Sequence, residues 1–204
     1  MDVVAKEVPW ARIEIDTRQA KVRVVQRWAY TWITAMGAGA WTDAEKKAFH
    51  DEVVRLITSR IKKDKVKAAA KDRCLVHDQF DLEFDIGWSL EKWKHWTVYA
   101  RKLPAGSTPT TLISEVRAAD RIIYLDSADT ADYNVCNAAA ACRTFNAVPH
   151  EFIHTFTGPD EYNGGSFLPD TDSVLNIGDE LRERHIRLLL KELNTMITGW
   201  TFSY

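Results

Sequence analysis

The chain has 204 residues with 27 basic and 29 acidic side chains, which leaves a formal net charge of −2. This near balance excludes a nucleic-acid binder that works by bulk positive charge. Hydrophobic residues make up 46% of the sequence and charged residues 27%, proportions that indicate a folded globular protein rather than a disordered one. The length suits one domain with a sizeable core, and we treat residues 1–204 as a single domain.

No apolar run approaches the roughly 18 residues that a transmembrane helix needs, so we expect no membrane partner. Residues 1–6 lack the basic-then-apolar pattern of a signal peptide. We therefore expect any action outside the cytoplasm to depend on another route of export.

Three cysteines are too few for a disulfide scaffold or a zinc ribbon. Cys136 and Cys142 are close enough in sequence to close a small loop in an oxidising compartment. All three thiols, Cys74 included, could equally be buried as small hydrophobic groups. The sequence leaves both interpretations open.

Alternating apolar and polar residues, or short apolar runs, predict strands at 11–16, 21–25, 80–86, 96–101 and 121–125. Thr42 and Glu45 have the spacing of a capping box, which predicts a helix start. That helix would end in the basic stretch 62–67. Its buried face would consist of Phe49, Val53, Leu56, Ile57 and Ile61.

A second, short helix is predicted at 149–157, with Pro149 in its first turn and Gly158-Pro159 ending it. A loop at 160–176 would lead to a final helix at 178–197. Residues 1–130 would thus form a small mixed or antiparallel sheet with one helix, and residues 131–204 two further helices and a loop. This order predicts the α+β class.

His150-Glu151-Phe152-Ile153-His154 has the pattern His-Glu-x-x-His. Residues four apart lie on one face of a helix, so both imidazoles can bind one metal ion. Zinc held in this way keeps a position for water and lowers the pKa of that water to about 7. Glu151 would lie beside the metal and act as the general base. The pattern therefore predicts a zinc hydrolase of peptide bonds.

The third metal ligand has several candidates. Asp160 follows His154 by a turn, with Glu161 beside it. Glu180 and His185 belong to the predicted final helix. The apolar face of that helix favours His185 and places Glu180 nearly opposite, although a first-turn residue can still face a neighbouring helix.

Residues 149–185 contain His-Glu-Phe-Ile-His, Pro-Asp-Glu-Tyr and Asp-Thr-Asp-Ser-Val-Leu-Asn-Ile-Gly-Asp-Glu-Leu-Arg-Glu-Arg-His. This stretch resembles the metallopeptidase effector domains at the C-terminus of VgrG spike proteins of type VI secretion, and related bacterial toxin peptidases. The resemblance implies a zincin-like fold, bound zinc, a protein or peptide substrate, and toxicity in the periplasm of a rival cell. It also implies a secretion spike and a cognate immunity protein as partners.

In that group a Glu beyond the motif helix completes the zinc site, and Glu180 is the position that matches it. Related sequences often have Ser-Ile-Met-Asn where this chain has Ser173-Val174-Leu175-Asn176. Loss of the Met argues against a methionine turn, and so against Asp160 as the ligand. We rank Glu180 first, His185 second and Asp160 third, with Asp160 and Glu161 as hydrogen-bond acceptors for the ligand imidazoles. His185 could instead stabilise the oxyanion.

We expect an extended substrate to pair with residues 121–125 as an edge strand. Two alternatives remain beside the peptidase. One is an inactive binding module on the same scaffold, against which the retained Glu151 argues. The other is a zinc amidase acting on cell-wall peptides, because the same activated water serves any amide.

Overall fold

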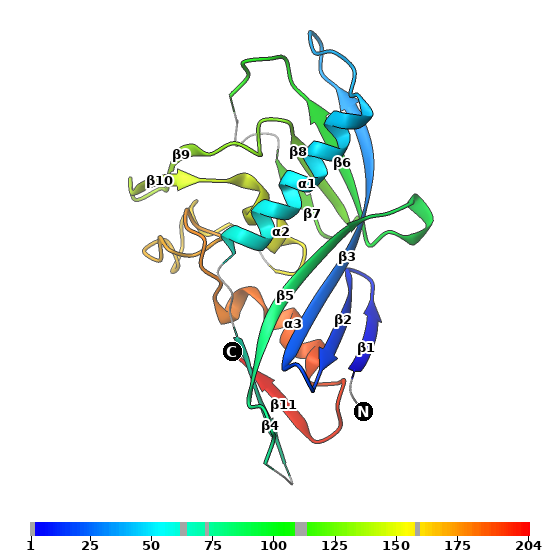
Figure 1. Ribbon diagram of the computed structural model, residues 1–204. Coiled ribbons are helices and arrows are strands. Elements are labelled where there is room, and N and C mark those ends of the chain that lie inside the picture. The colour runs from blue at the N-terminus through cyan, green and yellow to red at the C-terminus, as the bar shows by residue number, and fades with distance from the viewer. Residues whose placement is uncertain (1–2, 62–64, 72–73, 109–113, 158–159) are drawn as a thin grey trace.

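The computed structural model describes residues 3–61, 65–71, 74–108, 114–157 and 160–204. Within these ranges the chain forms a sheet of nine strands, a separate hairpin of two strands and three α-helices (Figure 1). The predicted α+β class is confirmed. No helix in these ranges is both long and apolar enough to span a membrane.

The large sheet is mixed in direction. Its strands are β1 (Val3–Val8), β2 (Ala11–Asp16), β3 (Lys21–Thr34), β4 (Lys65–Ala70), β5 (Gln79–Trp88), β6 (Trp96–Lys102), β7 (Glu115–Arg117), β8 (Ile122–Asp126) and β11 (Trp200–Ser203). The main order is β11-β4-β5-β3-β6-β8-β7, with β2 also on β3 and β1 on β2. β3 runs parallel to β5 and β6, and β6 parallel to β8, whereas β7 is antiparallel to β8.

Strand β3 is the centre of this sheet and is longer than the predicted segment 21–25. Lys21–Trp28 pairs with β5, and Trp28–Thr34 pairs with β6. Val22, Val24 and Trp28 are buried on one face. Trp28 and Trp32 are four residues apart, which places both on one face of this strand.

Helix α1 (Asp43–Arg60) begins as predicted, because Thr42 and Glu45 form both hydrogen bonds of a capping box. All five residues of its predicted apolar face are buried. The helix ends before the basic stretch, of which Lys65 opens β4. Residues 62–64 lie outside the described ranges.

Helix α2 (Ala147–His154) starts two residues before the prediction, with Asn146 as its N-cap and Pro149 in the first turn. Phe152 fixes this helix to the sheet. Its ring is fully buried and packs against Phe84 at 4.9 Å and Trp28 at 6.5 Å between ring centroids. The predicted helix stop, Gly158-Pro159, lies outside the described residues.

The prediction of a helix at 178–197 is wrong at both ends, because the α-helix found there is shorter. The structure has a short 3₁₀ helix, η2 (Glu183–His185), then α3 (Arg187–Leu193), and then β11. The backbone N–H of Glu180 donates to Asp172 O at 2.8 Å, and the Glu180 carbonyl accepts from Val174 N at 2.9 Å. These bonds occupy backbone groups that a helix beginning at 178 would need.

The remaining elements are short. A 3₁₀ helix, η1, spans Glu91–Trp93, and a hairpin joins β9 (Tyr133–Cys136) to β10 (Cys142–Phe145) immediately before α2. α1 and α2 pack against each other, and α2 also lies against β7. The hairpin, α2 and β7 together lie around His150, Glu151 and His154.

Candidate metal centre

Helix α2 places two imidazoles one turn apart. His150 is buried and His154 is partly buried. Their Nε2 atoms are 3.1 Å apart. Because Phe152 on the other side of the helix is fixed in the core, this face of α2 cannot rotate away.

Asp160 closes a triangle with these two nitrogens. Its Oδ1 lies 2.9 Å from His150 Nε2 and 3.1 Å from His154 Nε2. A carboxylate oxygen and an unprotonated imidazole nitrogen repel each other at such distances, since both present lone pairs. A cation between them removes the repulsion. In the described part of the chain, this cluster of His150, His154 and Asp160 could hold a metal ion.

The tautomer of His150 supports this arrangement. Its Nδ1 lies 2.8 Å from the carbonyl oxygen of Val174. A carbonyl only accepts, so Nδ1 carries a proton; in the neutral tautomer this leaves the Nε2 lone pair directed at the cluster. Metal-binding imidazoles are usually held by such a bond.

The segment that provides this carbonyl contains the expected site of the methionine turn. Leu175 occupies the Met position and is buried, with 2% of its surface exposed. Val174 still reaches His150. Leu in place of Met therefore leaves the hydrogen bond between Val174 and His150 intact. The missing Met is thus no reason to exclude Asp160 as a ligand.

The electrostatics of Asp160 follow from its neighbours. Burial raises the pKa of its carboxyl, but His150 and His154, whose rings donate to this carboxylate when their Nε2 atoms are protonated, outweigh burial and hold this pKa well below its usual range. Tyr162 is close to the same carboxylate. Burial raises the pKa of its phenol, and the charge of Asp160 and the hydrogen bond from the phenol to Asp160 raise this pKa further. Tyr162 thus keeps its proton beside the cluster.

Glu151 lies next to the two histidines without joining their cluster. Only 7% of its surface is exposed. Burial raises the pKa of its carboxyl above the ordinary value, while the charges of His150 and His154 act in the opposite direction. A carboxylate in this environment binds a proton more readily than one in water.

The side chain of Glu151 lines a cleft with a volume of about 360 Å³. The cleft is lined by Ser114, Glu115, Val116, Ala118, Glu151, His154, Thr157, Asp160 and Tyr162. Strand β7 therefore forms one wall of the cleft, and its only partner among the described strands is β8. The prediction that 121–125 forms the edge strand is wrong, because β8 lies between β6 and β7.

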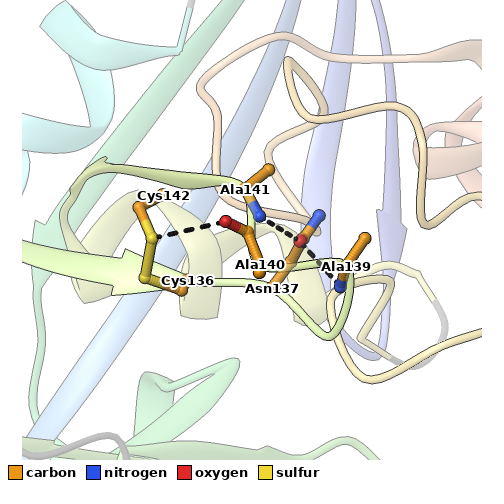
Figure 2. The surroundings of a disulfide bond; sticks show 6 residues. All are labelled: Cys136, Asn137, Ala139, Ala140, Ala141 and Cys142. Carbon is orange, nitrogen blue, oxygen red and sulfur yellow. Dashed lines mark hydrogen bonds between the residues drawn. A yellow bond between two sulfur atoms is a disulfide. The ribbon is translucent and has the colours of Figure 1, made fainter.

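The β9–β10 hairpin lies beside His150, where the ring of Phe145 packs against the imidazole at 5.2 Å between ring centroids. Cys136 and Cys142 are joined by a disulfide with a Cα–Cα distance of 4.0 Å (Figure 2). Asn137 organises the loop between them, where its Oδ1 accepts from the backbone N–H groups of Ala139 and Ala141. Cys74 is exposed and unpaired, so the alternative of three buried thiols is wrong.

The loop carrying Asp160 and Val174 is held by a buried network around Glu161. Arg184 donates to both carboxylate oxygens of Glu161, at 2.6 and 2.8 Å, and Ser173 Oγ donates at 2.5 Å. The Glu161 backbone N–H donates to Leu175 O at 2.8 Å. The hydrogen bonds of Glu161 therefore hold the loop together. The role expected from the sequence, accepting a hydrogen bond from a ligand imidazole, is filled for His150 by the Val174 carbonyl.

His185 belongs to this network and is fully buried. Its Nδ1 accepts from Arg182 N at 3.0 Å, so the proton is on Nε2, which lies 3.2 Å from Glu161 Oε1. In this state His185 presents no lone pair to the metal cluster. The structure does not bring it to the position of a third ligand or of an oxyanion donor.

Glu180, ranked first from the sequence, is also placed elsewhere. Its Oε2 accepts from Arg182 Nη1 at 2.8 Å. It does not belong to the cluster of ligand atoms found in the described residues. The structure thus brings together His150, His154 and Asp160, with Glu151 alongside. Tyr162 was overlooked as a functional residue, although it completes the Pro-Asp-Glu-Tyr fragment.

Comparisons with protein-family models, with curated proteins and with solved structures found no match to this chain.

The third ligand can be tested by comparing two carboxylates. We expect Asp160→Ala to weaken zinc binding by more than the roughly hundredfold that an outer-sphere change produces, because it removes a ligand atom. Glu180→Ala should leave zinc affinity nearly unchanged. Competition with a chelating dye measures both. A larger loss of zinc affinity in Glu180→Ala than in Asp160→Ala would instead make Glu180 the ligand.

The buried state of His185 should make stability depend on pH. Burial lowers its pKa to about 4 from 6.5. Between these values the unfolded chain binds more protons, so stability is present above pH 6.5 and is lost as the pH falls towards 4, by at most about 3 kcal/mol.

Urea unfolding of the metal-free protein across this range measures the effect. His185→Gln should flatten the dependence, whereas His77→Gln, at an exposed position, should not. An equal pH dependence in wild type and His185→Gln would contradict the assignment.

Proposed function

We propose that this protein is a zinc-dependent hydrolase of peptide bonds with a zincin-like fold. One observation carries the proposal: two imidazoles and a carboxylate converge on one point, and the buried Glu151 lines the same cleft. Neither the scaffold alone nor the motif alone would distinguish a peptidase from a binding module. The position of Glu151 beside the cluster favours catalysis.

The cluster suits zinc in donor type and spacing. Imidazole nitrogen and carboxylate oxygen are ordinary zinc ligands, and bonds of 2.0–2.1 Å in a tetrahedral site separate neighbouring ligand atoms by about 3.3 Å. The corresponding atoms are 2.9–3.1 Å apart. We propose His150, His154 and Asp160 as the ligands, in place of the set with Glu180.

When bound, zinc would polarise the scissile carbonyl and lower the pKa of a coordinated water to about 7. Glu151 takes a proton from the attacking water and later passes it to the leaving nitrogen. Its raised pKa suits the first of these steps, because a stronger base accepts the proton more readily. Tyr162 keeps its phenol proton and can donate a hydrogen bond to the oxygen of the attacked carbonyl.

Strand β7 supports a peptide as the substrate. It forms the wall of the cleft, and one of its edges has no partner among the described strands. An extended peptide can bind such an edge through main-chain hydrogen bonds, which hold it in register over the catalytic groups. An amide of the cell wall would use the same chemistry, but β7 favours an extended peptide.

Replacement of Glu151 separates metal binding from catalysis. We expect Glu151→Gln to bind zinc as tightly as wild type and to lose at least about a hundredfold in kcat, since the amide cannot accept the proton. Dye competition and hydrolysis of a fluorogenic peptide mixture measure the two properties. Activity at the wild-type level in the variant would contradict the general-base role.

We further propose, from the resemblance to delivered peptidases, that the protein is a toxin that acts in the periplasm of a rival cell. The disulfide of the β9–β10 hairpin supports this location, because such bonds persist in the periplasm and are rare in the cytosol. Carriage on a secretion spike and neutralisation by an immunity protein belong to the same proposal.

Directed expression tests the location. Wild-type protein exported to the periplasm of a test bacterium should stop growth, and the same protein kept in the cytosol should be far less toxic. Exported Glu151→Gln is the matched control and should be harmless. Growth arrest by that variant, or harmless export of an enzyme that is active in vitro, would contradict the proposal.

A further inference from the structure

The cleft continues on both sides of Glu151 into two hollows of different character. On one side it shares Ser114, Glu151 and Tyr162 with a very small hollow. On the other side it shares Ala118, His154 and Thr157 with a larger one. The two hollows therefore lie at opposite ends of a groove that crosses the catalytic residues.

The small hollow accepts little more than a methyl group. Its volume is about 20 Å³, which is room for roughly one water molecule. Tyr133, Val135, Phe145 and Ala147 give it an apolar lining. The first three belong to the β9–β10 hairpin, which the disulfide closes. Because this wall is cross-linked, the hollow cannot easily widen for a larger side chain.

The hollow at the other end has a volume of about 310 Å³ and carries positive charge. Two arginines, Arg184 and Arg187, line it, and they differ in whether an ion pair already occupies the side chain. Arg184 is already paired with Glu161 and Asp170. Arg187 is exposed at the start of α3, and no ion pair of its side chain is found in the described part of the protein. Arg187 is thus the cation available to a bound ligand.

The direction of strand β7 shows which end of the groove each end of a bound peptide would occupy. It starts after Ser114, beside the small hollow, and ends before Ala118, beside the hollow of Arg187. A peptide pairing antiparallel to β7, the more stable alignment, would run from Arg187 towards the small hollow. At about 3.3 Å per residue, two or three residues lie between the ends.

We propose that the substrate is a peptide with an acidic residue three or four positions before the cleaved bond and a small residue, Gly, Ala or Ser, directly after it. Arg187 recognises the acidic side chain, and the disulfide-closed hairpin excludes large side chains. This inference rests on the proposed peptidase function and adds its substrate class.

A randomised peptide mixture cut by the zinc-loaded full chain, with products identified by mass spectrometry, gives the preference. Matched peptides with Glu or Gln at the acidic position then measure the contribution of Arg187. We expect kcat/KM to be about two- to fivefold higher for the Glu peptide, the size of a solvent-exposed ion pair.

Substitutions assign this preference to one residue. Arg187→Gln should abolish it, and Arg187→Glu should make a Lys peptide better than the Glu peptide. Lys191→Gln removes the same charge one turn further along α3, outside the groove, and should retain the wild-type ratio.

Two failures are distinguishable. Cleavage without these preferences, or an unchanged ratio in Arg187→Glu, would overturn the substrate class and leave the peptidase function intact. A wild-type protein that binds zinc but cuts no peptide in the mixture would overturn both.

Discussion

The structure depends on the close approach of three electron-pair donors. Two imidazole nitrogens and the Asp160 carboxylate lie within 2.9–3.1 Å of one another, an arrangement that is repulsive, when both nitrogens are unprotonated, unless a cation lies between them. The fold must supply the free energy that holds these groups in place before a metal binds. Two buried structures, the aromatic contacts beneath α2 and the ion-pair network around Glu161, contribute it.

These two structures fix different members of the centre. Phe152 fixes α2, and with it His150, Glu151 and His154, against β3 and β5. Glu161 fixes the loop that provides Asp160 and the Val174 carbonyl, through Arg184 and Ser173. The hairpin is tied to the same loop, since Asn137 Nδ2 donates to Leu168 O at 3.2 Å. A change in either structure should therefore alter metal affinity without touching a ligand.

The helical part of the site could be predicted from sequence because its geometry is local. A spacing of four places His150 and His154 on one face whatever surrounds the helix. Asp160 could not be ranked correctly, because its loop has no periodicity and its position depends on distant partners such as Arg184. Three residues of β7 are too few to show alternation, so the neighbouring β8 was taken for the edge strand. The apolar positions of α3 predicted a helix, but bonds between Glu180 and the 172–174 backbone stop it from beginning earlier.

The central claim is that His150, His154 and Asp160 bind one metal ion. Anomalous diffraction at the zinc absorption edge, on crystals grown with zinc, tests it most directly. We expect one strong peak about 2 Å from Nε2 of each histidine and from a carboxylate oxygen of Asp160. A peak bound by Glu180 or His185, or two imidazoles turned apart with no peak between them, would contradict it.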